Sequence, residues 1–512
     1  SANFSGMDFA KENNEKVFVN PDVNEIYNIK TSSQINCSSL HRFFSIENFG
    51  IIEKEAKDLK VGDFVAQAGK IEIDGEERAI PQFKLKKIGK ISVEQGESIS
   101  NELKDRGFNR KEVCDNIGIT PRQFRRVLNQ EYPTSFEVFE NLQNHFGTQQ
   151  VLQMVPVVSY KHRNLIIPET LNPQFAQIFG YFIGDGNFEN GGLRFRDARV
   201  EVLQNYQGLF KELFNVDGKI SKMSSKNCYT LNINSREIRD LFELMLPTIL
   251  NEVGKSRNDV VCSFIKGFFD AEGHVNKKRA YVSAVQKNPQ ILRYLQLFLL
   301  RLGIRSTIKF DIGAKKMNVI RIIDKDVKGY LQVGFTALDK QQILLERVKS
   351  IQQTYSYEMV PIKREELRHL LERCGLHYSS IMKSRPQNYQ WVSRKELEAA
   401  FDALMNCAVK DRQLKQKIEF IGKILSKEII FEKIREINVS DNNGKMFYDF
   451  AVPKTQNYIA NGFIVHNSTY RVYFRRGKQG SRVAKMIDAP NLPENEAAFF
   501  LTVNGIRDEG VA

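Results

Sequence analysis

Two stretches of the chain share one pattern, GYFIGDG at residues 180–186 and GFFDAEG at residues 267–273. Small residues recur four positions apart in each copy, so they form one stripe along a helix and allow a second helix to approach closely. An acidic residue, Asp185 or Glu272, follows at the end of each helix. If the two helices pack on each other, the two carboxylates lie side by side.

Such a pair of carboxylates predicts a metal site. The two negative charges repel each other unless a cation lies between them, and hard oxygen ligands suit Mg²⁺. This arrangement serves metal-assisted cleavage of a phosphodiester, with a lysine at the end of each repeat available to stabilise developing charge. The alternative is a helix that simply ends at a glycine. Two copies in a duplicated frame favour the metal site over this alternative.

The repeat is longer than the pattern itself and runs over residues 180–255 and 267–340. Each copy continues with β-type sequence, a helix, a further strand and a short helix, so we expect two pseudo-symmetric α/β halves. The repeats resemble the two motifs of LAGLIDADG homing endonucleases. The resemblance implies halves of αββαββα type, a β-saddle over DNA and cleavage of both strands at a long site. The active-site residues that it implies are Asp185 and Glu272 as metal ligands, with Lys255 and Lys340 as the lysines.

Basic side chains in both repeats are candidates for DNA contact. A solvated strand face explains any single one of them equally well, because surface strands commonly carry Lys and Arg. The candidates are Arg194, Arg196 and Lys226 in the first half and Lys277, Lys309 and Arg321 in the second.

The composition indicates a protein of several domains with a polyanionic partner. The chain has 512 residues, enough for several hydrophobic cores, and its 75 Lys and Arg against 61 Asp and Glu give a net charge of +14. Its six Cys are scattered without a C-x-x-C pair, which argues against a zinc site or a disulfide framework. No signal-peptide pattern and no apolar run of membrane-spanning length occurs, so we expect a cytoplasmic protein.

A helix-turn-helix pattern precedes the repeats. Residues 109–118 read as a helix that ends at a glycine, and Thr120 and Pro121 suit the N-cap and first position of a second helix. The side chains that would enter a major groove are Arg122, Gln123, Arg125 and Arg126. A plain three-helix bundle with a basic, solvated face is the alternative. A second helical candidate for DNA contact covers residues 367–401.

A β module opens the chain and resumes near its end. Short β-type runs separated by turns occupy residues 25–87, and β-type sequence returns at residues 429–465. Insertions are tolerated at surface loops whose two ends lie close together. We therefore expect one β domain into which the helical and α/β segments are inserted.

The second β segment ends in VHNS at residues 465–468. An Asn side chain can attack its own main-chain carbonyl and close a succinimide, which cuts the chain after Asn467. His466 can protonate or polarise that amide, and Ser468 offers a hydroxyl that accepts an acyl group. For this tripeptide alone, a polar strand end is the alternative.

With an endonuclease-like segment inside a split β module that ends in His-Asn-Ser, the chain up to Asn467 resembles an intein. The resemblance implies an all-β Hint fold and self-splicing by acyl shift, transesterification and Asn cyclisation. It assigns to His41 the straining and protonation of the upstream scissile amide, with Ser38 in the position of the family's Thr. It assigns to Asp449 assistance of the first acyl shift, and Gln456 stands where the family often has a His.

The start of the chain leaves two registers open. Inteins open with Cys or Ser, whose side chain attacks the preceding carbonyl, and Ser1 is one candidate for this nucleophile. In the other register Ser1 ends the upstream segment and Ala2 occupies the nucleophile position; this register is slightly favoured. In the Ser1 register no upstream segment is left to be joined, and in the Ala2 register the nucleophile is missing. In either register we therefore expect that the chain does not complete a normal splice.

The end of the chain resembles the C-terminal part of an archaeal RadA-type recombinase. The resemblance rests on TYRVYFRRGK at residues 469–478 and MIDAP at residues 486–490. About 45 residues are too few to bury a core alone. They are expected to be the downstream flank that follows the splicing element.

These patterns together predict a multidomain chain. The expected segments are the first part of the Hint domain at 1–95, a helix-turn-helix-like insert at 96–150, the endonuclease domain at 151–350, a helical DNA-binding-like subdomain at 351–425, the second part of the Hint domain at 426–467 and the flank at 468–512.

Three functional hypotheses remain. The favoured one is a self-splicing intein that carries an Mg²⁺-dependent homing endonuclease, acts on double-stranded DNA as a monomer and has its flanking segments as partners in cis. The second is a splicing element whose endonuclease domain only binds DNA, and the presence of both Asp185 and Glu272 argues against it. The third is a Hedgehog-like autoprocessing domain that cleaves without ligating, and Ser468 with the recombinase-like flank argues against that.

Overall fold

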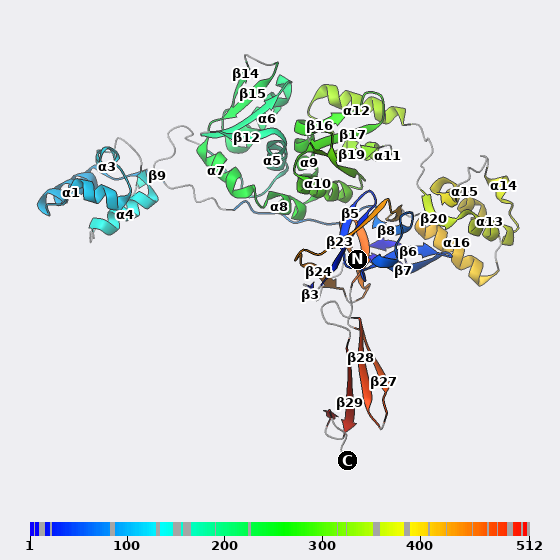
Figure 1. Cartoon of the computed structure of the whole chain (residues 1–512). Helices are drawn as coiled ribbons and strands as arrows, with labels where there is room; N and C mark the ends of the chain where they lie inside the picture. The colour runs from blue at the N-terminus through cyan, green and yellow to red at the C-terminus, as the bar shows by residue number, and fades with distance from the viewer. Residues whose placement is uncertain are drawn as a thin grey trace. The chain divides into compact units, whose positions relative to one another are not determined.

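The computed structural model divides the chain into two compact units, one of residues 1–73, 274–332 and 342–512 and the other of residues 74–273 and 333–341. Several separate sheets and helical groups make up these units (Figure 1). The residues that the structure describes are 1–4, 6–9, 16–20, 23–81, 88–129, 134–146, 155–156, 165–189, 191–223, 227–314, 316–323, 325–351, 359–382, 390–407, 410–425, 428–452, 454–467, 471–478, 480–488, 495–502 and 505–508.

One sheet of the first unit joins strands from opposite ends of the sequence. Its order is β22-β8-β26-β6-β7, and β25 forms a hairpin with β26. Strands coloured blue and orange therefore share this sheet (Figure 1). The strands are β6 (Arg42–Glu47), β7 (Gly50–Glu55), β8 (Phe64–Ala68), β22 (Ile429–Lys433), β25 (Asn457–Ala460) and β26 (Phe463–His466).

Two smaller sheets repeat this joining of early and late strands. β23 (Glu436–Asp441) pairs with β4 (Glu25–Lys30), which also pairs with β5 (Gln34–Cys37). β24 (Phe447–Ala451) pairs with β3 (Lys16–Asn20), and β1 (Ala2–Asn3) pairs with β2 (Asp8–Phe9). The core between these strands is apolar because alternate residues point inward. Its fully buried members include Ile29, Phe43, Val65, Phe463 and Val465.

The inserted segment leaves and re-enters this β module at neighbouring strands. Ala68 at the end of β8 lies opposite Ile429 at the start of β22, and the Gly69 amide donates a hydrogen bond of 2.6 Å to the Glu428 carbonyl. The two ends of the insertion are thus as close as adjacent antiparallel residues. A long insertion at such a point leaves the pairing of the flanking strands undisturbed.

The sheet of the second repeat belongs to the first unit and has the order β16-β17-β19-β18. Its strands are β16 (Gly273–Val275), β17 (Tyr281–Gln286), β18 (Thr307–Ile312) and β19 (Met317–Ile323), and α10 (Pro289–Arg301) packs on it; α11 (Lys325–Gly329) follows.

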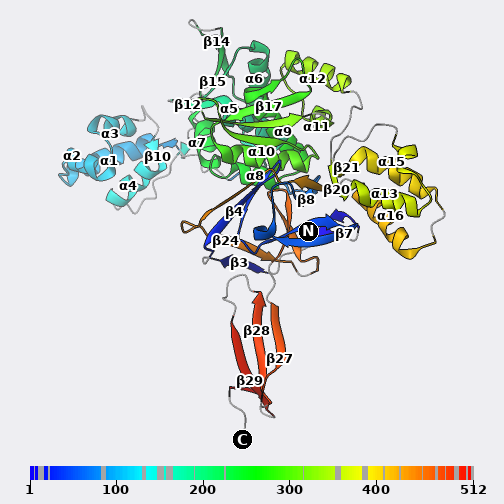
Figure 2. The same cartoon turned by 45° about the vertical axis from the view of Figure 1, so that its right-hand side comes forward.

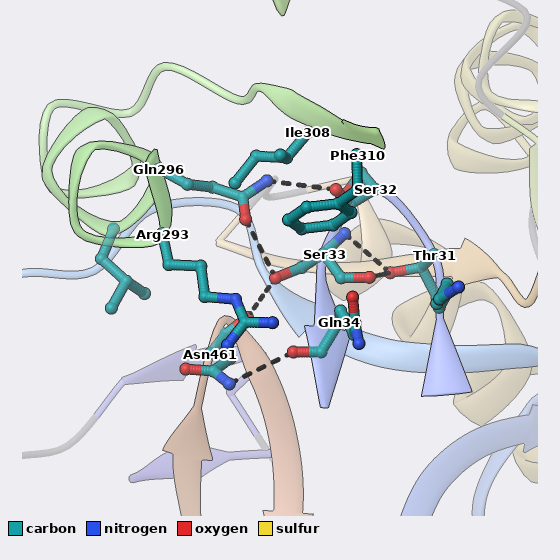
Figure 3. A pocket seen from close by; sticks show the side chains of 11 residues that line it. Thr31, Ser32, Ser33, Gln34, Arg293, Gln296, Ile308, Phe310 and Asn461 are labelled. Carbon is teal, nitrogen blue, oxygen red and sulfur yellow. Dashed lines mark hydrogen bonds between the residues drawn. The ribbon is translucent and has the colours of Figure 1, made fainter. Parts of the chain in front are cut away.

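Gln296 of α10 joins this repeat to the β module. Its amide donates to the carbonyls of Ser32 and Ser306 at 3.1 and 2.8 Å, and its oxygen lies 3.3 Å from the Ser33 hydroxyl oxygen. Figure 3 shows Gln296 facing Ser33, whose hydroxyl donates to the Asn461 carbonyl at 2.6 Å. Gln296, Ser33 and Asn461 line a small cleft of about 60 Å³. The hydrogen bond from Ser33 to Asn461 holds the turn between β25 and β26.

The second unit contains the first repeat and both helices of the duplicated pattern. Its sheet has the order β12-β13-β15-β14, which is the order found in the second repeat. The duplication seen in the sequence therefore corresponds to a repeated topology. The elements are α5 (Pro173–Asp185), β12 (Gly186–Glu189), β13 (Gly192–Asp197), α6 (Val200–Phe214), β14 (Lys219–Lys222), β15 (Tyr229–Ile233), α7 (Arg236–Met245), α8 (Ile249–Lys255) and α9 (Asn258–Glu272).

The stripe of small residues lets α5 and α9 pack backbone to backbone. A Cβ atom at Gly180 would lie 2.2 Å from the Phe264 carbonyl oxygen, and one at Gly267 would lie 1.9 Å from the Gln177 carbonyl oxygen. A Cβ at Gly184 would meet Ala271 at 2.6 Å. No larger residue fits at these positions without separating the helices.

The two inserted helical groups differ in how they are buried. α1 (Val93–Asp105), α2 (Arg110–Ile117), α3 (Pro121–Leu128) and α4 (Phe136–Phe146) enclose a core of their own. In contrast, α13 (Arg364–Arg373), α14 (Tyr378–Ile381), α15 (Arg394–Met405) and α16 (Arg412–Ile424) share one core with the β module, with Trp391 against Phe64 at 5.3 Å between ring centroids.

The remaining elements are short strands and the C-terminal sheet. β9 (Ile88–Lys90) pairs with β10 (Thr134–Ser135) and β11 (Val155–Pro156), and β20 (Met359–Lys363) pairs with β21 (Trp391–Ser393). Figure 2 shows β27 (Arg471–Arg476), β28 (Arg482–Asp488) and β29 (Glu496–Thr502) side by side, and β30 (Gly505–Arg507) pairs with β29. Among the described residues, no helix combines the length and the apolar character needed to cross a membrane.

Gly180→Ala should destabilise the second unit by about 1–3 kcal/mol or more, because the added methyl meets the Phe264 carbonyl. The matched control is Gly208→Ala in α6, where a Cβ meets nothing within 4 Å and the helix should gain up to about 1 kcal/mol. Urea unfolding of both variants measures the difference. Equal stability of the two would contradict the close packing of α5 and α9.

Candidate functional sites

The first candidate site lies at the end of β26, where the strand runs into Asn467. His466 and Asn467 are buried, with 6% and 1% of their surface exposed. Nδ1 of His466 lies 2.5 Å from the Asn467 carbonyl oxygen, and its Nε2 lies 3.8 Å from a Glu53 carboxylate oxygen. That carbonyl belongs to the peptide bond between Asn467 and Ser468. His466 is therefore placed to polarise this bond.

Hydrogen bonds hold both the side chain and the main chain of Asn467. Its amide donates to the Val452 carbonyl at 3.1 Å, and the main-chain amide of Asn467 donates to the Gln456 carbonyl at 2.9 Å. The Asn467 Oδ1 atom is buried and has no hydrogen-bond partner among the described residues. A buried amide with one unpaired acceptor carries an unfavourable free energy.

His41 and Asp449 lie in the same region of the β module. Burial lowers the pKa of His41, the Asp449 carboxylate raises it, and nearby His466 lowers it again. The His41 ring contacts Phe43 and Tyr458, with centroids 5.6 and 6.5 Å apart. Burial and the Asp449 charge also raise the pKa of Tyr458. His41 is therefore favoured in its neutral form, which can accept or donate a proton.

The turn before His41 is held by main-chain bonds. The Ser38 carbonyl accepts from the His41 amide at 3.3 Å, and the His41 carbonyl accepts from the Ala56 amide at 2.8 Å. The Ser38 side chain is half-buried at this turn. Ser38 thus shapes the loop that carries His41, whereas Ser468 lies outside the described residues.

The start of the chain enters the same β module. Ala2 is 1% exposed, and Ser1 beside it is half-buried. Both main-chain groups of Ala2 bond to the side chain of Asn457, at 2.6 Å for the amide and 2.9 Å for the carbonyl. Sequence reasoning missed Asn457, since no local pattern shows that its side chain reaches the first residues.

The second candidate site lies where α5 and α9 end in the second unit. Asp185 ends α5 and Glu272 ends α9, and a Cβ at Gly184 would be 3.2 Å from Glu272 Cγ. Burial raises the pKa of Asp185; Arg196 lowers it and Asp197 raises it. Burial and the Asp185 charge raise the pKa of Glu272 to about 7. The two carboxylates are thus close enough to repel each other.

The two predicted lysines are placed differently. Lys340, in α12 (Leu338–Ser350), donates from Nζ to the Asp270 carbonyl at 3.1 Å and lowers the pKa of Glu272. Burial lowers the pKa of Lys340 itself to about 8. Lys255 is exposed at the end of α8, and no hydrogen bond or ion pair joins its side chain to either carboxylate within the described part of the chain.

Asp270, two residues before Glu272, serves the structure. It is fully buried and accepts hydrogen bonds from the Tyr206 hydroxyl at 2.8 Å, the Thr336 amide at 2.7 Å and the Thr336 hydroxyl at 2.6 Å. All of its oxygens are thereby occupied. It fixes the end of α9 next to Glu272, and its place in the pattern alone did not reveal this role.

The donor set of this site suits a divalent cation. Asp185 and Glu272 are partly buried carboxylates, and across the described ranges neither makes a hydrogen bond or an ion pair. No group of three or more His, Cys, Asp or Glu side chains that could hold a metal ion occurs in the part of the chain that the structure describes. A metal here would use the two carboxylates with water or substrate oxygens, as Mg²⁺ commonly does.

The predicted DNA-contacting side chains of the repeats have varied surroundings. Arg194 pairs with Glu189 at 2.8 Å and donates to Asn232 at 2.8 Å. The Arg196 Nε atom is buried without a hydrogen-bond partner among the described residues, and its charge acts on Asp185. Lys277 and Lys309 are exposed, and Lys226 lies outside the described residues. The guanidinium carbon of Arg321 lies 5.0 Å from the centre of the Tyr281 ring.

The segment predicted as a helix-turn-helix contains two helices, α2 and α3, separated by a turn at Gly118. Gly118 ends α2 with φ of 81°, and Thr120 caps α3 through a reciprocal bond with Gln123. Because the Gln123 oxygen accepts from the Thr120 amide at 2.9 Å, this side chain is engaged at the helix start. Arg122 and Arg125 are exposed, and Arg126 is half-buried.

Glu272→Gln should raise the unfolding free energy by about 1–3 kcal/mol at pH 8, measured by urea unfolding with EDTA present. The folded-state pKa of about 7 lies above the ordinary value of 4.5, so ionised Glu272 destabilises the fold. This penalty grows as the pH rises from 4.5 and is complete above 7, so the gain should vanish at pH 4. The control Glu212→Gln, on the exposed face of α6, should show no such gain. An equal gain at pH 4 and pH 8 would contradict the assignment.

Comparison with known proteins identifies the family. Residues 1–467 match the family described as the intein splicing domain. The chain is 26% identical over 485 residues to glutamine–fructose-6-phosphate aminotransferase of Methanocaldococcus jannaschii, covering 88% of this chain and 41% of that protein. It is 42% identical over 69 residues to the DNA repair and recombination protein RadA of Methanocorpusculum labreanum, covering 14% of this chain and 20% of RadA. The chain thus spans less than half the length of these relatives.

Solved structures give weaker similarities. Mesophilic variants of the homing endonuclease I-DmoI match at 25% identity and a TM-score of 0.27, covering 31% of this chain and 88% of that one. Full-length DUF199/WhiA from Thermatoga maritima matches at 13% identity and a TM-score of 0.29, covering 51% of this chain and 94% of that one. The match over residues 1–467 covers most of the chain, and the chain therefore belongs to the intein splicing domain family.

Proposed function

We propose that this chain is a bifunctional intein, whose β module provides the acyl-transfer and Asn-cyclisation steps of protein splicing and whose repeats cleave double-stranded DNA. The observation that carries the splicing role is the His466 ring 2.5 Å from the Asn467 carbonyl, beside the buried Asn467 side chain. Membership of the intein splicing domain family supports the same conclusion. The similarity of a segment of 69 residues to RadA, together with the RadA-like sequence at residues 469–490, supports a recombinase as the flanking protein.

At the downstream junction, Asn467 is the nucleophile. Its side-chain nitrogen attacks its own carbonyl carbon, the bond to the Ser468 nitrogen breaks, and a proton passes to that nitrogen as the leaving amine. His466 polarises the carbonyl and supplies or relays the proton. The succinimide that forms retains the former side-chain nitrogen. Hydrogen bonding of the Asn467 amide to Val452 orients it for this attack.

At the upstream junction, we propose Ser1 as the nucleophile. Its hydroxyl attacks the preceding carbonyl, the amide bond to the Ser1 nitrogen breaks, and an ester forms with transfer of the hydroxyl proton to that nitrogen. His41 and Asp449 are proposed to move this proton, since the Asp449 carboxylate lies close enough to His41 to raise its pKa. The Ser468 hydroxyl then takes the acyl group from Ser1. This proposal takes the Ser1 register because Ser1 carries a hydroxyl, whereas the Ala2 register, slightly favoured by the sequence, leaves no nucleophilic atom at the junction.

The paired carboxylates support DNA cleavage by the embedded repeats. Asp185 and Glu272 would hold Mg²⁺, which when bound supplies charge stabilisation and an activated water at the scissile phosphodiester. Lys340, whose pKa is lowered to about 8, would stabilise charge that develops on the phosphate oxygens. Lys255 is proposed for the same role only if its exposed side chain turns toward the site on binding DNA. Arg196 would limit the repulsion at Asp185.

Basic side chains of the repeats and of the helical insert would contact DNA. Lys277 and Lys309 are exposed and are proposed to bind phosphates, as are Arg122 and Arg125 of α3. Arg194 already pairs with Glu189, so it would first have to exchange that partner. A net charge of +14 strengthens such contacts at low salt.

Asn467→Ala should slow release of the fragment 468–512 by at least about a thousandfold, because no other atom replaces the attacking nitrogen. Mass spectrometry of the incubated chain measures this release. The control Asn438→Ala removes an exposed amide of β23 and should leave the rate unchanged. Release of the same fragment from the Asn467→Ala chain would refute the cyclisation step.

Asp185→Asn should lower double-strand cleavage by at least about a hundredfold, because one of the two metal ligands is lost. The assay incubates plasmid bearing an uninterrupted recombinase gene with Mg²⁺ and counts linear product. Asp259→Asn, at the opposite end of α9 where Asp259 pairs with Arg257, is the matched control. Binding of the plasmid without any cut by the unsubstituted chain would instead support a domain that only binds DNA.

A further inference from the structure

We infer that Asn457 is a positioning residue that couples the two splice junctions. It holds the first residues of the chain against the hairpin that carries the downstream junction. This inference deepens the proposed splicing function and rests on it. Three independent features support it, namely the hydrogen bonds of the Asn457 side chain, the burial of the contact and the cross-strand register of Asn457.

The Asn457 side chain satisfies both main-chain groups of Ala2. Its Oδ1 accepts from the Ala2 amide at 2.6 Å, and its Nδ2 donates to the Ala2 carbonyl at 2.9 Å. The second hydrogen of Nδ2 goes to the Thr455 carbonyl at 2.8 Å, which fixes the orientation of the amide. A side-chain amide carries both a donor and an acceptor, as pairing with a peptide unit requires. A carboxylate of the same size would lack the donor.

Burial makes this contact difficult to replace. Asn457 and Ala2 are each 1% exposed, so water has little access to the main-chain groups if the side chain is removed. Unpaired main-chain groups in such a place are unfavourable. The chain near Ala2 would then move to find other partners, and Ser1 would move with it.

The main chain of Asn457 serves the other junction. In the β25–β26 hairpin Asn457 lies directly opposite His466, whose ring touches the Asn467 carbonyl. The residue before it, Gln456, accepts a hydrogen bond from the Asn467 amide. A single residue therefore contacts Ala2 through its side chain and sets the position of His466 through its backbone, although Ala2 and Asn457 are 455 positions apart in sequence.

These two roles predict separate effects. Loss of the side chain removes the hold on Ala2 and displaces the Ser1 hydroxyl from the carbonyl that it attacks, and a displacement of about 1 Å can cost about a hundredfold in rate. The hairpin itself is kept by main-chain pairing between β25 and β26. The upstream step should therefore slow far more than the downstream step.

The test uses a precursor in which a natural or model segment precedes Ser1. Hydroxylamine cleavage reports the ester at the upstream junction, and release of 468–512 reports the downstream step. For Asn457→Ala and Asn457→Asp we expect the upstream rate to fall at least about tenfold more than the downstream rate. The control is Asn461→Gly in the same hairpin. It removes the hydrogen bond from the Asn461 side-chain amide to the Gln34 carbonyl, at a residue whose φ of 50° suits glycine.

The measurements distinguish failure of the Asn457 inference from failure of the proposed role of Ser1. Equal slowing of both junctions by the Asn457 variants would reduce Asn457 to a structural residue and overturn the inference. A precursor with native Asn457 that shows no upstream cleavage, or whose cleavage survives Ser1→Ala, would instead refute the proposed role of Ser1. Hydrogen exchange of the Ala2 amide gives a readout free of chemistry. It should become at least about tenfold faster in Asn457→Ala while the amides of β25 and β26 stay protected, and unchanged exchange would overturn the inference.

Discussion

The position of β26 between β6 and β8 is the constraint on which the candidate site at His466 and Asn467 depends. Val465 lies opposite Phe43 and Phe463 opposite Gln67, so a strand from the end of the family match is enclosed by two strands from its start. Closing a loop of several hundred residues costs about 5 kcal/mol in chain entropy. Burial of Phe463, Ile464 and Val465, each worth about 1.5–3 kcal/mol, is enough to offset that cost. Three apolar side chains thus hold His466 and Asn467 in place.

Local patterns predicted the elements that depend on short-range physics. The stripe of small residues at Gly180, Gly184 and Gly267 predicted the close contact of α5 and α9, because helical periodicity fixes which residues share a face. Cap residues around Thr120 likewise predicted the start of α3. In each case the information lies within a few residues of the feature.

Roles that depend on distant contacts were not readable in this way. Asn457 reaches Ala2 only because the hairpin and the first strand meet in the folded chain. Lys255 and Lys340 are equivalent in the repeat, but Lys340 alone of the two influences Glu272. The environments of Asp185 and Glu272 also differ, since Arg196 acts on the former and Lys340 on the latter. Duplication in sequence does not ensure symmetry of charge.

The different burial of the two helical inserts has a consequence for how this chain was assembled. Helices α1–α4 surround their own core, so they form a cassette that can be gained or lost without exposing the apolar interior of another part. Helices α13–α16 share their interior with Phe44, Phe64 and Ile464 of the β module. Loss of these helices would expose these apolar side chains of the β module to solvent. A shorter relative of this chain without helices α13–α16 would therefore need polar substitutions on that face of the β module.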